Sequence, residues 1–187
     1  MLLTKTYNRE RAVEYARRWA LDRNPLFIDF TGIGGNCTNF VSQCILAGCC
    51  TMNYTPDFGW YYISPEERAP AWSSVEFFYE FLTESERFKA ANGGVGPFAR
   101  EVAREAAEIG DVVQYADSEG DWYHTVIITR IDGDEIFVSA QSDDARDRPI
   151  STYNFASARF LHIEGVRISL EDDACFEILL SGGNEEA

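Results

Sequence analysis

Residues 110–115 read Gly-Asp-Val-Val-Gln-Tyr, and the pattern of the sequence changes at this stretch. Before it, apolar residues recur at helical spacing. After it, short runs rich in β-branched and aromatic residues alternate with turn signals. Helices first and strands afterwards are typical of an α+β domain with an antiparallel sheet. A chain of 187 residues also fits one domain, so we expect a single domain over 1–187.

The predicted elements follow from this division. The expected helices are Arg9–Leu21, Cys37–Ala47, Ser73–Leu82 and Pro97–Glu108. The expected strands are Asp111–Tyr115, Tyr123–Ile131, Ile136–Ala140, Phe160–Ile168 and Ala174–Leu180, followed by a polar tail over Ser181–Ala187. Asn8 is the predicted N-cap of the first helix and Gly48 the predicted C-cap of the second. The Asp132-Gly133 pair predicts a hairpin.

Charge and composition exclude several classes of function. Sixteen basic against 31 acidic residues give a net charge of −15, which disfavours binding to nucleic acid or to anionic membranes. No apolar stretch approaches the roughly 20 residues of a membrane-spanning helix, and no signal peptide is visible. We therefore expect a cytoplasmic protein, with export of a longer parent left open.

The five cysteines are an odd number, which favours reduced thiols in a cytosolic setting. Their spacing contains no C-x-x-C pair, so we predict neither a metal site nor a cofactor. A redox or metal role for Cys44, Cys49 and Cys50 is an alternative to their being small buried residues after the helix.

Cys37 is the first candidate for chemistry. It follows a Gly-Gly-Asn turn and opens an apolar helix. Free N–H groups and the helix dipole at such a position favour a thiolate, which is the nucleophilic form of cysteine. The alternative is a small apolar residue at the start of a buried helix.

His124 is the candidate base, because it begins a predicted strand directly after a polar turn. His162 lies in the middle of a strand, where a structural role is expected. A third residue usually orients the imidazole. The end of the neighbouring strand supplies Asp143 as our choice, with Gln141, Ser142 and Asp144 as alternatives and a solvated acidic loop as the non-functional interpretation.

Several stretches carry a resemblance to a known family. The main ones are residues 34–43 (GGNCTNFVSQ), Trp60-Tyr61-Tyr62, Ala71-Trp72, and the Gly110-Asp111 strand followed by His124. Over about residues 7–165 the chain resembles an amidase domain family of Gram-positive bacteria, related to the CHAP and NlpC/P60 groups. The resemblance implies a papain-like fold, with N-terminal helices packed on an antiparallel sheet. Residues 169–187 form an extension outside it.

The resemblance implies that Cys37 is the nucleophile and His124 the base of an amide hydrolase acting through a thioester. It also implies a peptide or peptidoglycan-fragment substrate. The alternative is a binding module that keeps the fold without catalysis. Asn36, Trp60, Tyr61 and Trp72 are the expected substrate-binding residues. For the aromatic side chains, simple packing of a long loop on the core remains the competing interpretation.

Overall fold

The computed structural model describes residues 2–169 and 175–183. The helices are α1 (Arg9–Trp19), α2 (Cys37–Cys49), α3 (Pro70–Ser73), α4 (Val75–Leu82), α5 (Glu86–Asn92) and α6 (Cys175–Ser181), with short 3-10 turns η1 (Arg104–Ala106) and η2 (Ile150–Thr152). The strands are β1 (Leu3–Lys5), β2 (Gly96–Val102), β3 (Val112–Ala116), β4 (Trp122–Asp132), β5 (Glu135–Ala140), β6 (Ala145–Pro149) and β7 (Ser157–Ile168). This mixture of helices and antiparallel strands confirms the α+β prediction.

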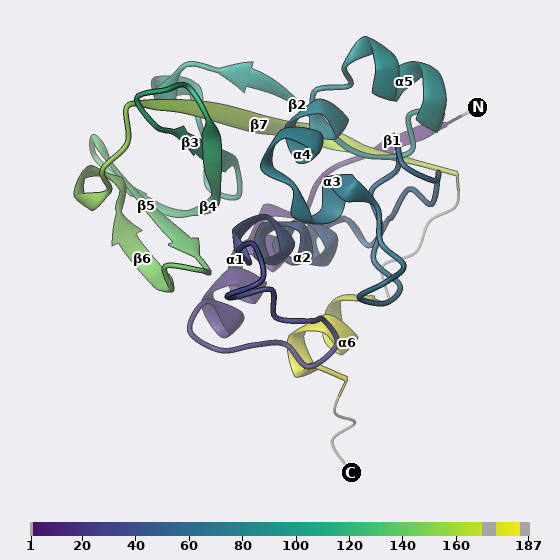
Figure 1. Cartoon of the computed structure of the whole chain (residues 1–187), viewed down its shortest axis with the longest axis horizontal. Helices are drawn as coiled ribbons and strands as arrows, with labels where there is room; N and C mark the ends of the chain where they lie inside the picture. Colours follow the sequence, from purple (N-terminus) through teal and green to yellow (C-terminus); the bar gives the residue numbers. More distant parts are fainter. Residues whose placement is uncertain (1, 170–174, 184–187) are drawn as a thin grey trace.

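The sheet is organised around β7, which runs across the molecule in Figure 1. The strand order is β1-β7-β3-β4-β5-β6, and β2 also pairs with β7, all antiparallel. Phe160 pairs with both Val113 and Val102. Therefore β3 lies along one edge of β7 and β2 along the other. Beyond β3, the strands β4, β5 and β6 curl away from the helices (Figure 1).

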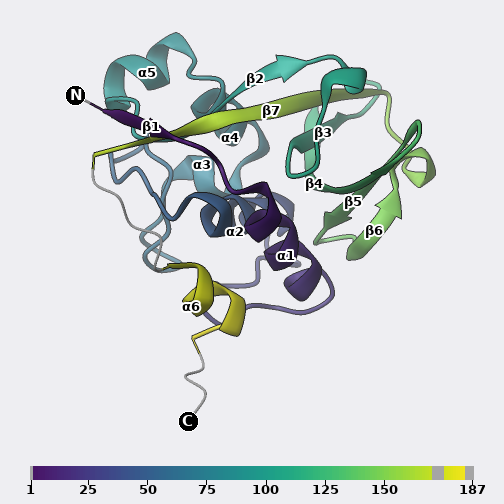
Figure 2. The ribbon, with the colours of Figure 1, turned by 180° about the vertical axis from the view of Figure 1, so that it is seen from behind.

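The two faces of the curled sheet bury two separate apolar clusters. Side chains alternate along a strand, so Ile127 of β4 joins the cluster beneath the helices. Val126 and Ile128 join the second cluster, which lies inside the curl. Helices α1 and α2 pack against each other at the centre of the molecule, and the reverse view in Figure 2 shows α6 beside them.

Helix α2 is buried along its whole length. It runs two residues beyond the predicted end, and its C-cap is Cys50, which is left-handed with φ of 48°. Gly48 does not end the helix. A Cβ at this position would lie 2.3 Å from Cε2 of Tyr7, so the glycine permits close packing on the segment before α1. There Asn8 caps α1 as predicted, accepting from the Arg11 N–H at 3.0 Å.

Two predicted elements are wrong in kind. The expected helix Pro97–Glu108 is strand β2 followed by η1, because pairing with β7 overrides the helix propensity of Ala99, Arg100 and Glu101. The expected strand Ala174–Leu180 is helix α6. Its first residue lies outside the described part of the chain, as do residues 184–187 of the predicted tail.

Other differences concern boundaries and short elements. The expected helix Ser73–Leu82 is confirmed as α4, which begins two residues later, and the Ser74 hydroxyl caps it by accepting from the Phe77 N–H; Ser73 instead ends α3. The strand predictions around β3, β4, β5 and β7 are confirmed to within a few residues. The turn at Gly133, with φ of 58°, confirms the predicted hairpin between β4 and β5.

Candidate active site

Cys37 is the first residue of α2 and is buried. Its sulfur lies 3.8 Å from the Thr38 hydroxyl oxygen and 4.0 Å from the Tyr123 carbonyl oxygen. The Asn36 side chain makes no capping hydrogen bond to the helix. Among the described residues, the first backbone N–H groups of α2 therefore receive no capping bond from Asn36 at the end where the helix dipole is positive.

Asn36 fixes the loop that leads into Cys37. Its Oδ1 accepts from the Phe30 N–H at 2.9 Å and from the Asn39 amide at 2.8 Å, and its own amide donates to Gln141 Oε1. With 1% of its surface exposed, Asn36 lies beneath the loop and not on the pocket wall. The side-chain amide is engaged in positioning the loop, and the expected role of Asn36 in substrate binding stays a prediction.

His124 stands near the start of β4, opposite Tyr115 of β3. Its ring lies among three tyrosine rings, with centroids 5.9 Å from Tyr115, 6.2 Å from Tyr153 and 6.3 Å from Tyr123. Nε2 is buried and has no hydrogen-bond partner among the residues that the structure describes. Because that nitrogen is closed off, Nδ1 is the ring nitrogen left to act in the adjacent pocket.

The environment of His124 favours the neutral imidazole. Burial lowers its pKa to about 4, the nearby Asp143 carboxylate opposes this shift, and the Arg148 guanidinium adds to it. The ring is therefore uncharged at neutral pH and can accept a proton there.

Cys37 and His124 line one pocket of about 480 Å³. A hydrogen bond between the Thr38 and Thr125 hydroxyls, 2.9 Å long, joins the first turn of α2 to β4 beside them. No hydrogen bond joins the Cys37 thiol to the His124 ring in the described residues. The other residues lining this Cys37–His124 pocket are Gly34, Gly35, Tyr123, Ser142, Asp143, Arg148, Thr152, Tyr153 and Asn154.

Two of the four candidates for orienting His124 have other partners. The Gln141 amide donates to the Trp19 and Asp22 carbonyls at 2.7 and 2.8 Å. The Ser142 hydroxyl accepts from the Asn36 N–H, with Ser142 itself in a left-handed conformation at φ of 80°. Both residues hold the Cys37 loop against the end of β5 and neither contacts the imidazole through a hydrogen bond.

The two acidic candidates differ from each other. Asp144 forms a bidentate pair with Arg23, with both N–O distances 3.0 Å. Asp143 lines the pocket and is the carboxylate that acts on the His124 pKa. Of the four, Asp143 is the one placed to influence the ring electrostatically, and its role as third member stays a prediction.

Arg148 and Tyr153 were not among the predicted site residues. Arg148 Nη1 donates to Asp143 Oδ2 at 2.6 Å, and its guanidinium stacks 3.9 Å from the Tyr153 ring centroid. Its remaining nitrogens donate to Thr152. One sequence signal could have found these residues: they follow the predicted acidic loop at Asp143 and Asp144. The chain that returns from this loop passes the end of the sheet where the loop lies.

The aromatic residues expected to bind substrate do not line this pocket. Trp60 and Trp72 are fully buried in the core beneath the helices, where their indole N–H groups donate to the Ser42 hydroxyl and to Asn39 Oδ1. Tyr61 packs on Tyr54, with ring centroids 5.5 Å apart. None of the three lines the Cys37–His124 pocket. This placement favours the competing interpretation, packing of the long loop on the core, and a role of these residues in substrate binding stays a prediction.

The cysteines also require a correction. Cys50 and Cys175 form a disulfide that ties α6 to the end of α2, so the five thiols are not all reduced. Cys44 and Cys49 are free and buried; burial raises the pKa of both thiols, that of Cys49 to about 12. Within residues 2–169 and 175–183, no three His, Cys, Asp or Glu side chains are grouped to hold a metal ion.

His162 belongs to a different setting, which we call the Asp111 network. The fully buried Asp111 carboxylate contacts Arg9 Nη1 at 2.6 Å, His162 Nδ1 at 2.9 Å and the Ile163 N–H at 3.0 Å. These contacts join α1 to β7 at the sheet. They place His162 in the structural role expected for it.

Comparison with known proteins assigns the family. Over residues 6–163 the sequence matches the family described as "Putative amidase domain". The chain belongs to this family. The chain is also similar to the uncharacterized protein YhbB of Bacillus subtilis (strain 168), to which it is 35% identical over 147 residues. That alignment covers 76% of this chain and 43% of YhbB, so the chain spans less than half of its relative.

No solved structure matches the amidase-family chain. Across its described residues, no helix has both the length and the apolar character needed to cross a membrane. The family assignment suggests hydrolysis of an amide bond.

Proposed function

We propose that this chain is a cysteine-dependent amide hydrolase with Cys37 as nucleophile and His124 as general base. The observation that carries the proposal is the meeting of these two side chains in one pocket of an amidase-family protein. Cys37 begins a buried helix, and His124 offers a neutral imidazole from the neighbouring strand.

The reaction uses groups already present at the pocket. The Cys37 sulfur attacks the amide carbonyl carbon while His124 takes the thiol proton, and the free N–H groups at the start of α2 stabilise the oxyanion. The C–N bond then breaks, the imidazolium protonates the leaving amine, and a thioester remains. Water, deprotonated by His124, hydrolyses that thioester and restores the thiol.

A nucleophilic cysteine at a helix start beside a strand-borne histidine supports a papain-like arrangement related to the CHAP and NlpC/P60 groups. This relation suggests peptides of the peptidoglycan type as substrates. The Cys50–Cys175 disulfide favours an oxidising compartment over the cytoplasm, because such bonds persist where thiols are not kept reduced. Peptidoglycan fragments would be met in such a compartment.

A non-catalytic binding module is the second candidate. It is favoured by one observation: Nε2 of His124 lacks a partner, and no hydrogen bond joins the ring to Cys37 in the part of the chain that the structure describes. This candidate predicts that peptide fragments bind the pocket without being cleaved.

The test is hydrolysis of soluble peptidoglycan peptides, followed by the appearance of new amino groups. The wild-type chain should release amines and Cys37→Ala should not, while Cys44→Ala, which alters a buried thiol away from the pocket, should keep the activity. Equal release by Cys37→Ala would reject the cysteine mechanism. Fragment binding without release by either protein would favour the binding module.

A further inference from the structure

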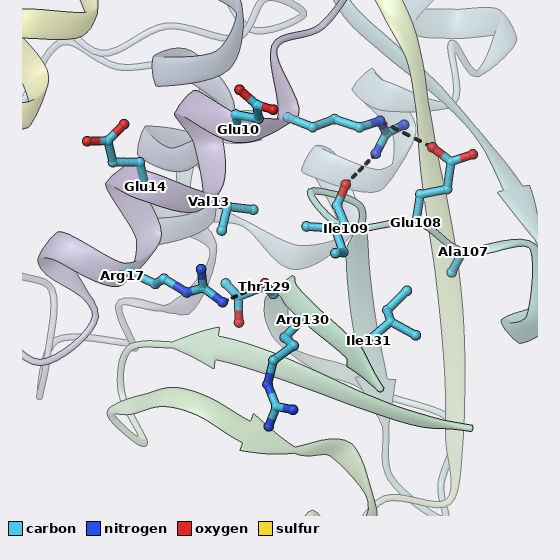
Figure 3. A pocket seen from close by; sticks show the side chains of 11 residues that line it. Glu10, Val13, Glu14, Arg17, Ala107, Glu108, Ile109, Thr129, Arg130 and Ile131 are labelled. Carbon is cyan, nitrogen blue, oxygen red and sulfur yellow. Dashed lines mark hydrogen bonds and ion pairs between the residues drawn. The ribbon is translucent and has the colours of Figure 1, made fainter. Parts of the chain in front are cut away.

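A second cavity lies at the other end of β4 from His124. It measures about 760 Å³ against about 480 Å³ for the Cys37–His124 pocket. Helix α1 forms one wall, residues 107–109 another, and the end of β4 the third (Figure 3). Arg130 lies six positions after His124 along β4, which is about 20 Å at roughly 3.3 Å per residue. The cavity is therefore separate from the proposed catalytic site.

The floor of this cavity is apolar. Three apolar side chains line it in Figure 3: Val13 from α1, Ile131 from β4, and Ile109 from the segment before β3. Of these, Ile109 is 40% exposed. A second hollow of about 340 Å³ shares Ala107 and Ile131 with it and continues toward the β4–β5 hairpin. We call the two hollows together the α1 groove. The first hollow is mainly apolar, whereas Arg104, Glu105 and Asp134 make the second one more polar, so the two together suit a segment of chain that carries both kinds of side chain.

The arginines beside the groove are engaged within the protein. Arg9 donates to the Ile109 carbonyl at 2.9 Å and pairs with Asp111. Arg17 donates to the Thr129 carbonyl at 3.0 Å. Arg130 pairs with Asp132 and stacks 3.4 Å from the Phe137 ring centroid. Their charges are therefore largely satisfied before any ligand arrives.

Unlike these arginines, two carboxylates at the rim of the groove have no partner among the described residues. Glu10 and Glu14 lie one helical turn apart on the exposed side of α1 (Figure 3). Neither has a hydrogen bond or ion pair with any residue that the structure describes. The charge that the groove offers to a ligand is thus negative, in a chain whose net charge is −15. This sign disfavours a second copy of the chain as occupant and favours a basic one.

We propose that the α1 groove binds a polypeptide segment that carries both apolar and basic side chains. The apolar side chains lie on Val13, Ile109 and Ile131, and the basic ones meet Glu10 and Glu14. This interaction is independent of the proposed hydrolysis, since it needs neither Cys37 nor His124.

The test measures fluorescence anisotropy of a labelled ten-residue peptide of alternating leucine and lysine. The full chain carries Cys37→Ala, so that the probe cannot be cleaved. The peptide should bind, and replacing its leucines by serine should weaken binding at least about tenfold through loss of buried apolar area. A peptide with glutamate in place of lysine should not bind.

Substitutions in the α1 groove test whether the peptide binds there. Ile109→Asp, at an exposed position, should weaken binding at least about tenfold, and Glu10→Gln with Glu14→Gln about threefold or more with a smaller salt dependence. The matched control Glu86→Gln with Glu177→Gln removes the same charge elsewhere and should change binding less than about twofold. Unchanged binding by Ile109→Asp would overturn the proposal, as would equal weakening by the two double variants. Thermal melting confirms that each variant is folded.

Discussion

The two histidines of this chain occupy contrasting surroundings on one sheet. His162 has its Nδ1 against the buried Asp111 carboxylate and lies beside Arg9, so its polar contacts are provided by the fold. His124 is buried among tyrosine rings with Nε2 unpaired, and it lines a pocket together with a cysteine. Contacts to a buried carboxylate are typical of a structural residue, whereas a buried ring that lines a pocket beside a cysteine is a candidate for function.

The largest difference between His124 and His162 is expected in catalytic activity. His124→Ala should reduce kcat/KM for amide hydrolysis by at least about 10³-fold, because the general base and acid are lost together. His162 does not line the Cys37–His124 pocket, so His162→Ala should leave kcat/KM within about threefold in the folded fraction. Equal losses in the two variants would remove the distinction between the two histidines.

For stability, the Asp111 network that holds His162 should matter most. Asp111→Ala should lower the free energy of unfolding by about 3–5 kcal/mol, since it leaves Arg9 and His162 without their buried partner. Asp132→Ala removes an exposed pair with Arg130 and should cost about 0–1 kcal/mol. Urea denaturation measures both. An Asp111→Ala protein as stable as the Asp132→Ala control would show that the Asp111 network does not hold the fold.

The pH dependence of the free energy of unfolding tests whether the folded protein buries His124 as a neutral ring. The folded-state pKa of His124 is about 4, below its ordinary value near 6.5, because burial disfavours the charged ring. Between these values the unfolded chain binds a proton that the folded chain does not. Stability is therefore fully present above pH 6.5 and falls as the pH drops toward 4, by at most about 3 kcal/mol. His124→Gln should flatten this part of the urea-denaturation profile, and an unaltered profile would contradict the burial of a neutral ring.

The smallest effects concern Asp143 and Arg148. Asp143→Asn should lower the pKa of His124 further, and Arg148→Gln should raise it, because the two charges act on the imidazole with opposite signs. An NMR titration of the His124 ring protons measures both shifts. Shifts of the same sign would mean that the substitutions act by rearranging the loop and not through their charges.

Local signals in the sequence were sufficient for much of the fold. The spacing of apolar residues predicted α1 and α2, and Asp132-Gly133 predicted the β4–β5 hairpin. Elements that depend on distant partners were not predictable in this way. Strand β2 exists because it pairs with β7, and α6 is fastened by a disulfide between residues 125 positions apart.

The candidate site was predictable in part for the same reason. Cys37 and His124 were singled out by their positions at the starts of elements, and the structure brings both to one pocket. The surroundings were not predictable, since they depend on tertiary packing. Trp60 and Trp72 are buried in the core, where they donate hydrogen bonds to Ser42 and Asn39 of α2, and Ser142 in the β5–β6 turn is held in a left-handed conformation.

The most direct test of the account is the rate of Cys37 alkylation by iodoacetamide against pH, read by mass spectrometry in the wild type and in His124→Ala. This measurement needs no knowledge of the substrate. The account predicts that Cys37 reacts selectively over the buried Cys44 and Cys49 at neutral pH, and that His124→Ala slows this reaction because the imidazole no longer takes the thiol proton. A Cys37 that reacts no faster than the other free thiols, or equally fast without His124, would contradict the proposed nucleophile and base.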